Sequence, residues 1–315
     1  MIPLIYHPIY SQLPLPQGHR YPINKYRLLY DEICLVSKDN PAWCHTFSFV
    51  EPLPLTIDTV SKTHCSKYVD ALSLGLLPAA KMRRIGFPWS ECLIERTLLS
   101  SGGTCLTAEL AVERGIAIHL SGGYHHAHYD FGSGFCLFND LVLAANHALG
   151  IDGVDKVLIV DSDVHHGDGT ATLCADNDDI VTLSFHCEKN FPARKPNSDL
   201  DIALPKAVTD DEYLPHFRSV VEMAVNIHQP DLIIYDAGVD IHIDDELGYF
   251  NVSQQGIYIR DEFMLNLAKM KEIPIACVVG GGYRSDHRAL VPLHMQLIKA
   301  VFQLRKKPTT NGSGL

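Results

Sequence analysis

The stretch at residues 161–169 reads Asp-Ser-Asp-Val-His-His-Gly-Asp-Gly and directly follows the apolar run Val157-Leu158-Ile159-Val160. A short apolar run rich in β-branched residues is typical of a buried strand in a parallel sheet. Open α/β sheets bind their ligands outside the carboxyl ends of their strands. The acidic and imidazole groups that follow the run therefore emerge where such a fold would place a site.

Side chains alternate across an extended strand, so Asp161, Asp163 and His165 share one side and Ser162 and Val164 the other. Carboxylates and neutral imidazoles bind a divalent ion such as zinc, and a catalytic zinc site needs three protein ligands and one open position. The stretch offers two such ligands and requires a third from elsewhere. Taken alone, it also fits a turn-rich strand end in which Asp and Gly make tight bends.

Length and composition limit the class of protein. A chain of 315 residues with 46% hydrophobic content can form one α/β domain around a single sheet, and we expect that domain at residues 1–305. The polar, Gly/Ser-rich end at residues 306–315 is expected to be a flexible tail. The net charge of −11, without a Lys/Arg cluster, argues against direct binding to nucleic acid or to an anionic membrane. A cationic substrate is compatible with that charge.

Sequence features also bear on the compartment. No apolar stretch reaches the ~18 residues of a membrane span, and the first eight residues lack the basic region of a signal peptide. The nine cysteines are scattered, odd in number and without a C-x-x-C pair, which indicates neither a disulfide framework nor a thiolate zinc site. We therefore expect a soluble protein in a reducing cytoplasm, with its oligomeric state left open.

Apolar runs alternate with helical periodicity along the chain, which predicts a doubly wound, mostly parallel sheet flanked by helices. Ser101-Gly102-Gly103, within one long periodic segment, indicates either close helix packing or a kink. The polar loop at residues 7–21 is expected to be either disordered or functional. Predicted strands lie at residues 4–6, 116–120, 157–160, 180–185, 232–235 and 275–279, and predicted helices at 63–74, 90–114, 138–149, 210–228, 253–270, 286–304 and from Pro22 onward.

Three further predicted strands end in segments that can do chemistry. Tandem histidines, His125 and His126, follow one strand, an acidic loop at residues 236–248 follows another, and Gly280-Gly281-Gly282-Tyr283 follows a third. Each has an ordinary reading: a half-exposed turn, a solvated surface loop, or a core tyrosine with a satisfied hydroxyl. Four such coincidences at one edge of a sheet are improbable, which favours one shared site.

With these segments the sequence resembles the zinc-dependent histone deacetylase family, within the arginase and deacetylase superfamily. The resemblance covers nearly the whole chain, and its early part is similar to the class IV branch and its bacterial relatives. It rests on Gly122-Gly123-Tyr124-His125-His126, Gly134-Phe135-Cys136-Leu137-Phe138-Asn139-Asp140, residues 161–169 and 280–283, and, in the early part, His7-Pro8, Gly18-His19-Arg20-Tyr21-Pro22 and Lys25-Tyr26.

The resemblance implies a role for each matching residue. It makes Asp163, His165 and Asp245 the ligands of a zinc ion, with ferrous iron as an alternative metal. It pairs the catalytic His126 with Asp168 and His125 with Asp161, and makes Tyr283 the transition-state tyrosine. It assigns the tunnel walls to Gly134, Phe135 and Phe191, and a potassium site to Asp161, Asp163, His165, Ser184 and Phe185.

Two departures from the family pattern matter for these assignments. Asp245 is chosen over Asp244 because Asp245-Glu246-Leu247-Gly248 aligns with the family's Asp-Pro-Leu-Gly, although Glu246 replaces the proline. There is also no clear counterpart of the rim aspartate that holds the substrate backbone in class I enzymes. The nature of the substrate therefore stays open between acyl-lysine and a small acyl-amine such as an acyl-polyamine.

The chemistry expected from these groups is hydrolysis of an amide. A metal with three protein ligands polarises the carbonyl and lowers the pKa of water toward ~7, His126 takes the water proton, and Tyr283 stabilises the oxyanion. An arginase-type ureohydrolase would need a second metal, but Gly167 stands where another carboxylate would be required. A non-catalytic acyl-amine binding protein is expected to have lost one of these groups, and all are present.

Overall fold

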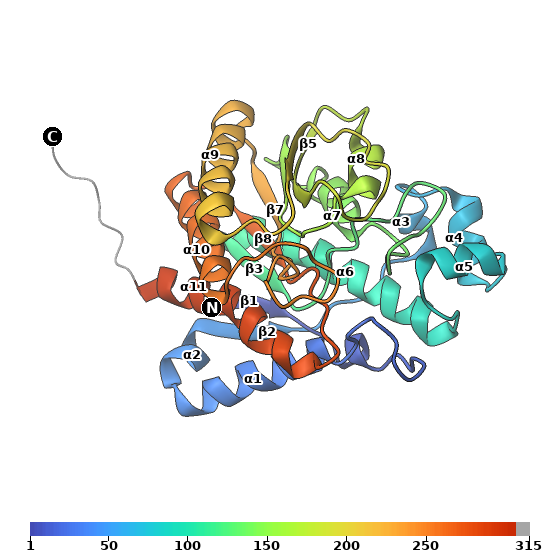
Figure 1. Cartoon of the computed structure of the whole chain (residues 1–315), viewed down its shortest axis with the longest axis horizontal. Coiled ribbons are helices and arrows are strands. Elements are labelled where there is room, and N and C mark those ends of the chain that lie inside the picture. The colour runs from blue at the N-terminus through green and yellow to red at the C-terminus, as the bar shows by residue number, and fades with distance from the viewer. Residues whose placement is uncertain (307–315) are drawn as a thin grey trace, which may run out of the picture.

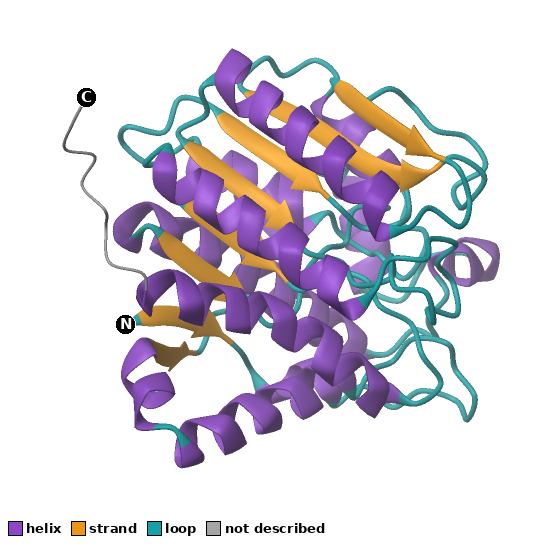
Figure 2. Ribbon diagram, turned by 60° about the vertical axis from the view of Figure 1, so that its left-hand side comes forward, coloured by secondary structure: helices purple, strands orange, loops and turns teal. Residues whose placement is uncertain are grey.

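The computed structural model describes residues 1–306, so the tail predicted at 306–315 lies outside the described residues except for its first. One sheet of eight strands runs through the centre in the order β2-β1-β3-β8-β7-β4-β5-β6, and every neighbouring pair is parallel (Figure 2). The predicted parallel α/β sheet is therefore confirmed. The strands are β1 (Ile2–Ile5), β2 (Phe47–Val50), β3 (Ile116–His119), β4 (Val157–Asp161), β5 (Ile180–Cys187), β6 (Leu200–Leu204), β7 (Leu232–Asp236) and β8 (Ile275–Val278).

Helices cover both faces of the sheet (Figures 1 and 2). One face carries α6 (Glu91–Arg114), α7 (Asp140–Ala148) and α8 (Asp168–Cys174), which pack on one another and on the strands beneath. On the other face lie α1 (Lys25–Asp39), α9 (Asp210–His228), α10 (Gln254–Met270) and α11 (Val291–Lys306). The remaining short helices are η1 (Pro8–Ser11), α2 (Pro41–Thr46), α3 (Ile57–Val60), α4 (Ser66–Ser73), α5 (Ala79–Ile85) and η2 (His287–Leu290).

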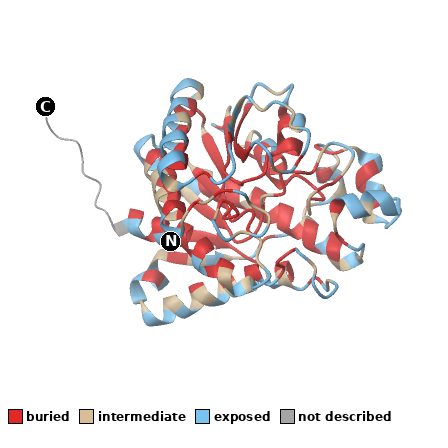
Figure 3. Cartoon of the chain, in the orientation of Figure 1, coloured by how far each residue is buried: buried red, intermediate tan, exposed pale blue. Residues whose placement is uncertain are grey.

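The burial of each strand explains whether it could be predicted from the sequence. Every residue of β4, β5, β7 and β8 is buried, because helices cover both faces there (Figure 3). The edge strands β2 and β6 mix buried with more exposed positions and were missed. An apolar run marks only strands that are covered on both faces, so edge strands escape that criterion. None of the helices within residues 1–306 combines the length and apolar character that crossing a membrane requires.

The glycine pair in α6 marks close packing rather than a kink, since α6 is one continuous helix of 24 residues. A methyl group added at Gly102 would overlap the carbonyl oxygen of Leu53. One added at Gly103 would approach His119 Nε2 and the Tyr10 hydroxyl to 2.5 Å. The two glycines therefore let the N-terminal loops and β3 approach the helix backbone directly.

We expect Gly102→Ala to lower the free energy of unfolding by about 1–3 kcal/mol, the usual cost of overpacking. The better helix propensity of alanine, about 1 kcal/mol, offsets only part of this. Urea denaturation followed by circular dichroism measures the change. Glu95→Ala, at an exposed position of the same helix, is the control and should change stability by less than about 0.5 kcal/mol. Equal stability of the two variants would contradict the packing argument.

Candidate active site

The chemically capable segments all leave the sheet at one edge. Strands β3, β8, β7, β4 and β5 are consecutive neighbours in the sheet, and all run in the same direction. Their carboxyl ends therefore lie side by side, although the segments that follow them are separated by up to 160 residues of sequence. The tandem histidines, the residues after β4, the acidic loop and the triple glycine meet there, as the sequence predicts.

The residues after β4 form the centre of this region. Asp163 and His165 are buried, and the Nδ1 atom of His165 lies 2.9 Å from Asp163 Oδ1. The same nitrogen lies 3.1 Å from Oδ2 of Asp240, a fully buried residue of the acidic loop. Potential ligand atoms of Asp163, His165 and Asp240 all lie within 4.8 Å of one another, so the three side chains could hold one metal ion. Sequence reasoning did not select Asp240 as a ligand.

Asp245, the predicted third ligand, lies beside this group but outside the 4.8 Å cluster. Its Oδ2 accepts a hydrogen bond of 2.7 Å from the backbone of Tyr283, and its Oδ1 accepts from the backbone of Leu247 and Gly248. The alternative Asp244 is mostly exposed and forms an ion pair with Arg284, at 3.3 Å. The choice of Asp245 over Asp244 agrees with this arrangement, but its role as a ligand stays a prediction.

The charges around the group suit a divalent cation. Burial, and then the charge of Asp163, raises the pKa of Asp240 to about 8. Burial also raises the pKa of Asp245 to about 6 and that of Asp236 well above its usual value. Asp236 is fully buried, and its Oδ2 has no hydrogen-bond partner among the described residues. A raised carboxyl pKa means that burial and neighbouring charges disfavour the ionised form, and a bound cation would favour that form.

One buried cation already lies next to these carboxylates. Lys25, at the start of α1, donates a hydrogen bond of 2.8 Å from Nζ to the carbonyl oxygen of Gly280, and Nζ lies 5.8 Å from the centre of the Tyr283 ring. Burial lowers the pKa of Lys25 to about 8, against the attraction of Asp240 and Asp163. Sequence reasoning used Lys25 only as part of a motif and missed its position at the site.

The tandem histidines each contact the carboxylate that the sequence assigned to them. His125 Nδ1 lies 2.7 Å from Asp161 Oδ2, and His126 Nδ1 lies 2.6 Å from Asp168 Oδ1. The two Nε2 atoms are 3.0 Å apart. Asp168 also binds His128 Nε2, at 2.9 Å through its second oxygen. His128 stands two residues after His126 in the sequence, but nothing in that spacing indicated that it shares the same carboxylate.

The two imidazoles have opposite tendencies to bind a proton. Burial lowers the pKa of His126 to about 3, and the neighbouring charge of His125 acts in the same direction. Burial also opposes the charged form of His125, but Asp161 and Asp163 outweigh it and raise the pKa well above its usual value. His125 therefore carries the additional proton and a positive charge. His126 stays neutral, the form in which an imidazole accepts a proton.

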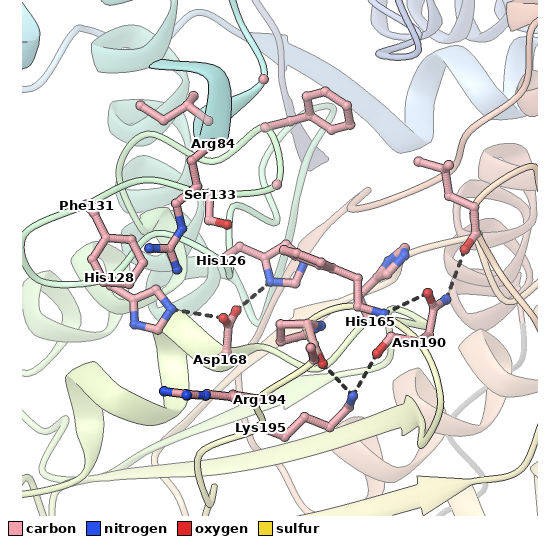
Figure 4. A pocket seen from close by; sticks show the side chains of 18 of the residues that line it. Arg84, His126, His128, Phe131, Ser133, His165, Asp168, Asn190, Arg194 and Lys195 are labelled. Atoms are coloured by element: carbon pink, nitrogen blue, oxygen red, sulfur yellow. Dashed lines mark hydrogen bonds and ion pairs between the residues drawn. The ribbon is translucent and has the colours of Figure 1, made fainter. Parts of the chain in front are cut away.

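A pocket of about 1140 Å³ leads from the surface to these groups, and His126, His165, Asp168 and Tyr283 all line it. Figure 4 shows His126 and His165 side by side, with Asp168 between His126 and His128. Within residues 1–306, Tyr283 makes a hydrogen bond through its backbone N–H and none through its hydroxyl. Burial, followed by the charges of Asp163 and Asp240, raises the pKa of Tyr283 well above its usual value. The phenol therefore stays protonated and can donate a hydrogen bond into the pocket.

The predicted tunnel residues also line this pocket. The ring of Phe191 packs edge-on against His126, with the ring centres 4.8 Å apart, and Phe135 lies 6.0 Å from the Tyr283 ring. A methyl group at Gly134 would approach His126 Cδ2 to 2.6 Å, so the absence of a side chain leaves room for the imidazole. Gly134, Phe135 and Phe191 thus form apolar walls around the approach to the histidines.

The predicted potassium residues lie on two adjacent strands and the turn after β4. Ser184 pairs with Asp161 in the register of β5 with β4, and Phe185 follows it, fully buried. The Ser184 hydroxyl lies 3.1 Å from His186 Nδ1. The potassium site itself stays a prediction. A separate group that was not anticipated from the sequence consists of His166, His186 and Asp201, whose potential ligand atoms lie within 4.8 Å of one another.

Comparisons with known proteins agree with this geometry. A family model described as the histone deacetylase domain matches residues 21–296. The chain belongs to the histone deacetylase family. An uncharacterised protein of Picosynechococcus sp. is 40% identical over 298 residues, covering 95% of this chain and 97% of that protein. Histone deacetylase 2 of Arabidopsis thaliana is 33% identical over 255 residues, covering 78% of this chain and 65% of that protein.

Two further comparisons concern a yeast relative and a solved structure. Histone deacetylase RPD3 of Saccharomyces cerevisiae is 30% identical over 253 residues, and the match spans 73% of this chain and 57% of that protein. The crystal structure of the HDA15 HD domain matches with a TM-score of 0.80 at 21% identity, covers 98% of this chain and 90% of that chain, and shows the same fold. Family membership makes deacetylation, a hydrolysis, the general class of reaction.

We expect Asp163→Ala and His165→Ala to stay folded but to bind little metal, because each removes one of the ligands at the centre of the group. Asp245→Ala should behave in the same way. Metal content after dialysis, measured by inductively coupled plasma mass spectrometry, tests this. Asp244→Ala is the matched control and should retain its metal, since that side chain is exposed. Full occupancy in the Asp163 or His165 variant would disprove the assignment.

Asp240 needs a separate test, because its carboxylate lies in the cluster while Asp245 is the ligand that the family pattern assigns. We expect Asp240→Asn to weaken metal binding by roughly 10- to 100-fold, the range for groups that orient a ligand. Asp245→Ala should weaken it much more. Isothermal titration with zinc gives both dissociation constants. The reverse order would make Asp240 the third ligand.

Proposed function

We propose that this histone deacetylase family member is a zinc-dependent deacylase that removes an acyl group from a lysine side chain or a similar amine. One observation supports this most directly: the neutral imidazole of His126, the phenol of Tyr283 and His165 of the Asp163/His165/Asp240 group all line the same pocket. These are the parts that hydrolysis of an unactivated amide requires. The sequence features of the early loops support a place near the class IV branch.

The residues that would hold the metal are Asp163 and His165, with Asp245 or Asp240 as the third. A divalent ion bound there would supply Lewis acidity to the amide carbonyl and to the attacking water. The donor set of carboxylates and one imidazole suits zinc and also ferrous iron. The proposed set of cofactors also includes a potassium ion, bound where Asp161 of β4 and Ser184 of β5 pair, next to the turn after β4.

His126 is placed to take the proton of the attacking water. Its Nδ1–H donates to Asp168, which fixes the tautomer and leaves Nε2 to accept a proton. His125 Nε2 lies 3.0 Å from His126 Nε2 and holds the neighbouring imidazole in place, while Asp161 stabilises the positive charge that His125 already carries. Return of the proton to the leaving nitrogen then releases a primary amine, together with a carboxylate.

Tyr283 is placed to stabilise the oxyanion that forms on the carbonyl. Its backbone N–H donates to Asp245, which fixes the turn after β8, and its hydroxyl remains available to the pocket. Lys25 also contacts this turn, because its Nζ donates a hydrogen bond to the carbonyl oxygen of Gly280. Donors that are held in position before the reaction stabilise developing charge without the cost of reorganisation.

The alternative functions have less support. A methyl group at Gly167 would approach Asp161 Oδ2 to 2.5 Å, so this position has no room for the extra carboxylate of a two-metal ureohydrolase. A non-catalytic binding protein would not need the paired histidines and carboxylates that are present. The nine free cysteines support a reducing compartment, and we propose the cytoplasm. We also propose that the protein acts without binding nucleic acid or membranes directly.

We expect Tyr283→Phe to lower kcat and kcat/KM together by on the order of 10²- to 10³-fold, as loss of an oxyanion donor does. Metal content should be unchanged. The control is Tyr249→Phe, which removes a hydroxyl from another tyrosine of the same pocket and should leave turnover nearly intact. Steady-state kinetics on an acyl-lysine peptide, with a thermal melt and a metal assay, tests this. Near wild-type kcat in metallated Tyr283→Phe would remove Tyr283 from the mechanism.

The activity itself is tested with a panel of acyl-lysine peptides and acyl-polyamines that spans acetyl to long-chain acyl groups. The enzyme is loaded with zinc or with ferrous iron under nitrogen. Release of a free amine from at least one substrate is expected, and it should stop when the metal is chelated. Absence of turnover on the whole panel in a metal-loaded, folded protein would refute the proposed function.

A further inference from the structure

The mouth of the pocket carries a charge opposite to that of the whole chain. Five basic side chains line the pocket and are called the basic rim below: Arg20, Arg83, Arg84, Arg194 and Lys195. Among the described residues that line the pocket, only Asp168 and Glu246 are acidic. The chain as a whole has 26 basic and 37 acidic residues. The pocket lining, in contrast, has five Arg or Lys residues and two Asp or Glu residues. An even distribution of charge would give the opposite excess.

The basic rim is not neutralised by the protein itself. Within the described residues, none of the five side chains lies within 4.0 Å of a carboxylate. Asp168 is buried and committed to His126 and His128. Glu246 accepts hydrogen bonds from the backbone and hydroxyl of Ser285. Among the described residues, the five positive charges of the basic rim therefore have no carboxylate in ion-pair contact.

Two members of the rim are held in place. The guanidinium of Arg84 lies over the Phe131 ring at 3.8 Å, and Phe131 stacks on His128, whose Nε2 binds Asp168. Lys195 Nζ donates to the carbonyl oxygens of Asn190 and Pro192, which fixes its loop. Figure 4 shows Arg84 on one side of Asp168, and Arg194 and Lys195 on the other. The rim thus surrounds the entrance from separate segments.

The pocket is also larger than one acyl-lysine side chain requires. Its volume of about 1140 Å³ exceeds the usual range of 300–1,000 Å³ for small-molecule sites. The part of the pocket between Phe135 and Phe191, where Phe191 packs against His126, is apolar and suits the acyl chain and the methylene groups of the amine. The outer part, where the basic rim lies, contacts whatever the amine is attached to.

We propose that the substrate is anionic: an acylated amine whose non-acyl part carries carboxylate groups that the basic rim binds. This rests on the proposed deacylase function and specifies the substrate class of the same site. Clustered charge of one sign at a cleft concentrates ligands of the opposite sign and repels those of the same sign. Acyl-polyamines and acyl-lysines in Lys/Arg-rich peptides are therefore disfavoured, even though the net charge of −11 would by itself attract them.

The test compares three acyl-lysine peptides of equal length in which the neighbours of the acyl-lysine are Asp, Ala or Lys. We expect kcat/KM to fall in that order, with about a tenfold difference between the acidic and basic peptides at low salt. The difference should shrink as the salt concentration rises from 0.1 M to 1 M, because the Debye length falls from about 10 Å to about 3 Å.

Charge-reversal variants assign the preference to the rim. Arg84→Glu with Arg194→Glu should abolish or invert the order of the three peptides. The control, Lys38→Glu with Lys67→Glu, changes the net charge equally at exposed positions outside the pocket and should keep the order. If the first pair fails to fold, Arg20→Glu with Arg83→Glu is used, because the side chains of these residues make no hydrogen bond to other described residues.

A binding assay separates failure of this inference from failure of the proposed function. Fluorescence anisotropy with labelled peptides and the Tyr283→Phe variant measures affinity without turnover. Absence of turnover with preferential binding of the acidic peptide would refute the deacylase function alone. Equal or reversed affinities for the acidic and basic peptides would overturn the anionic substrate, whether or not the enzyme turns over.

The same assay identifies the source of the carboxylates. Free Nε-acyl-lysine is compared with its methyl ester, and both are compared with the Asp-flanked peptide. Preference for free acyl-lysine over its ester would indicate a small amino-acid substrate. Preference for the Asp-flanked peptide over both would indicate an acidic protein segment. Both outcomes support an anionic substrate, whereas stronger binding of the ester than of the free acid and the acidic peptide contradicts it.

Discussion

The structure depends on burying a group of carboxylates at the carboxyl ends of its central strands. Asp161, Asp163, Asp236 and Asp240 are almost completely inaccessible. Removing charges from water is costly unless they are paired, hydrogen-bonded or bound to a metal. His125, His165 and the ammonium of Lys25 offset part of this charge, and raised pKa values at Asp236 and Asp240 show that part remains. A metal ion at this place would therefore serve both folding and catalysis.

The sheet order makes this concentration of charge possible. Five adjacent parallel strands end at the same edge, so segments far apart in the chain contribute side chains to one small volume. Close approach of the backbones is equally necessary: a methyl group at Gly281 would overlap the carboxylates of Asp163 and Asp240. The triple glycine after β8 therefore allows the turn that carries Tyr283 to pass directly beside the proposed metal ligands.

The pocket combines two electrostatic regions along its depth. The carboxylates of Asp163 and Asp240 lie next to His165, one of its lining residues, which suits a cation, while its mouth carries the basic rim. Between them lie the aromatic walls, Phe135 and Phe191, which separate the charges and leave an apolar passage. A ligand that is neutral at its acyl end and negative at its outer end matches both regions in only one orientation. For the proposed anionic substrate, this arrangement would set the orientation as well as the affinity.

The sequence by itself determined the buried strands and the helices between them, and its resemblance to the histone deacetylase family implied the pairing of His125 and His126 with Asp161 and Asp168. The strands and the place of the site follow from local patterns, since a strand covered on both faces is an apolar run and its carboxyl end is where a ligand binds. Only the tertiary structure revealed the edge strands β2 and β6, the place of Asp240 in the ligand group, the contact of His128 with Asp168, and the basic rim. Edge strands lack a continuous apolar run, and the other features join side chains whose distances depend on how separate loops fold over the sheet, which residue spacing does not encode.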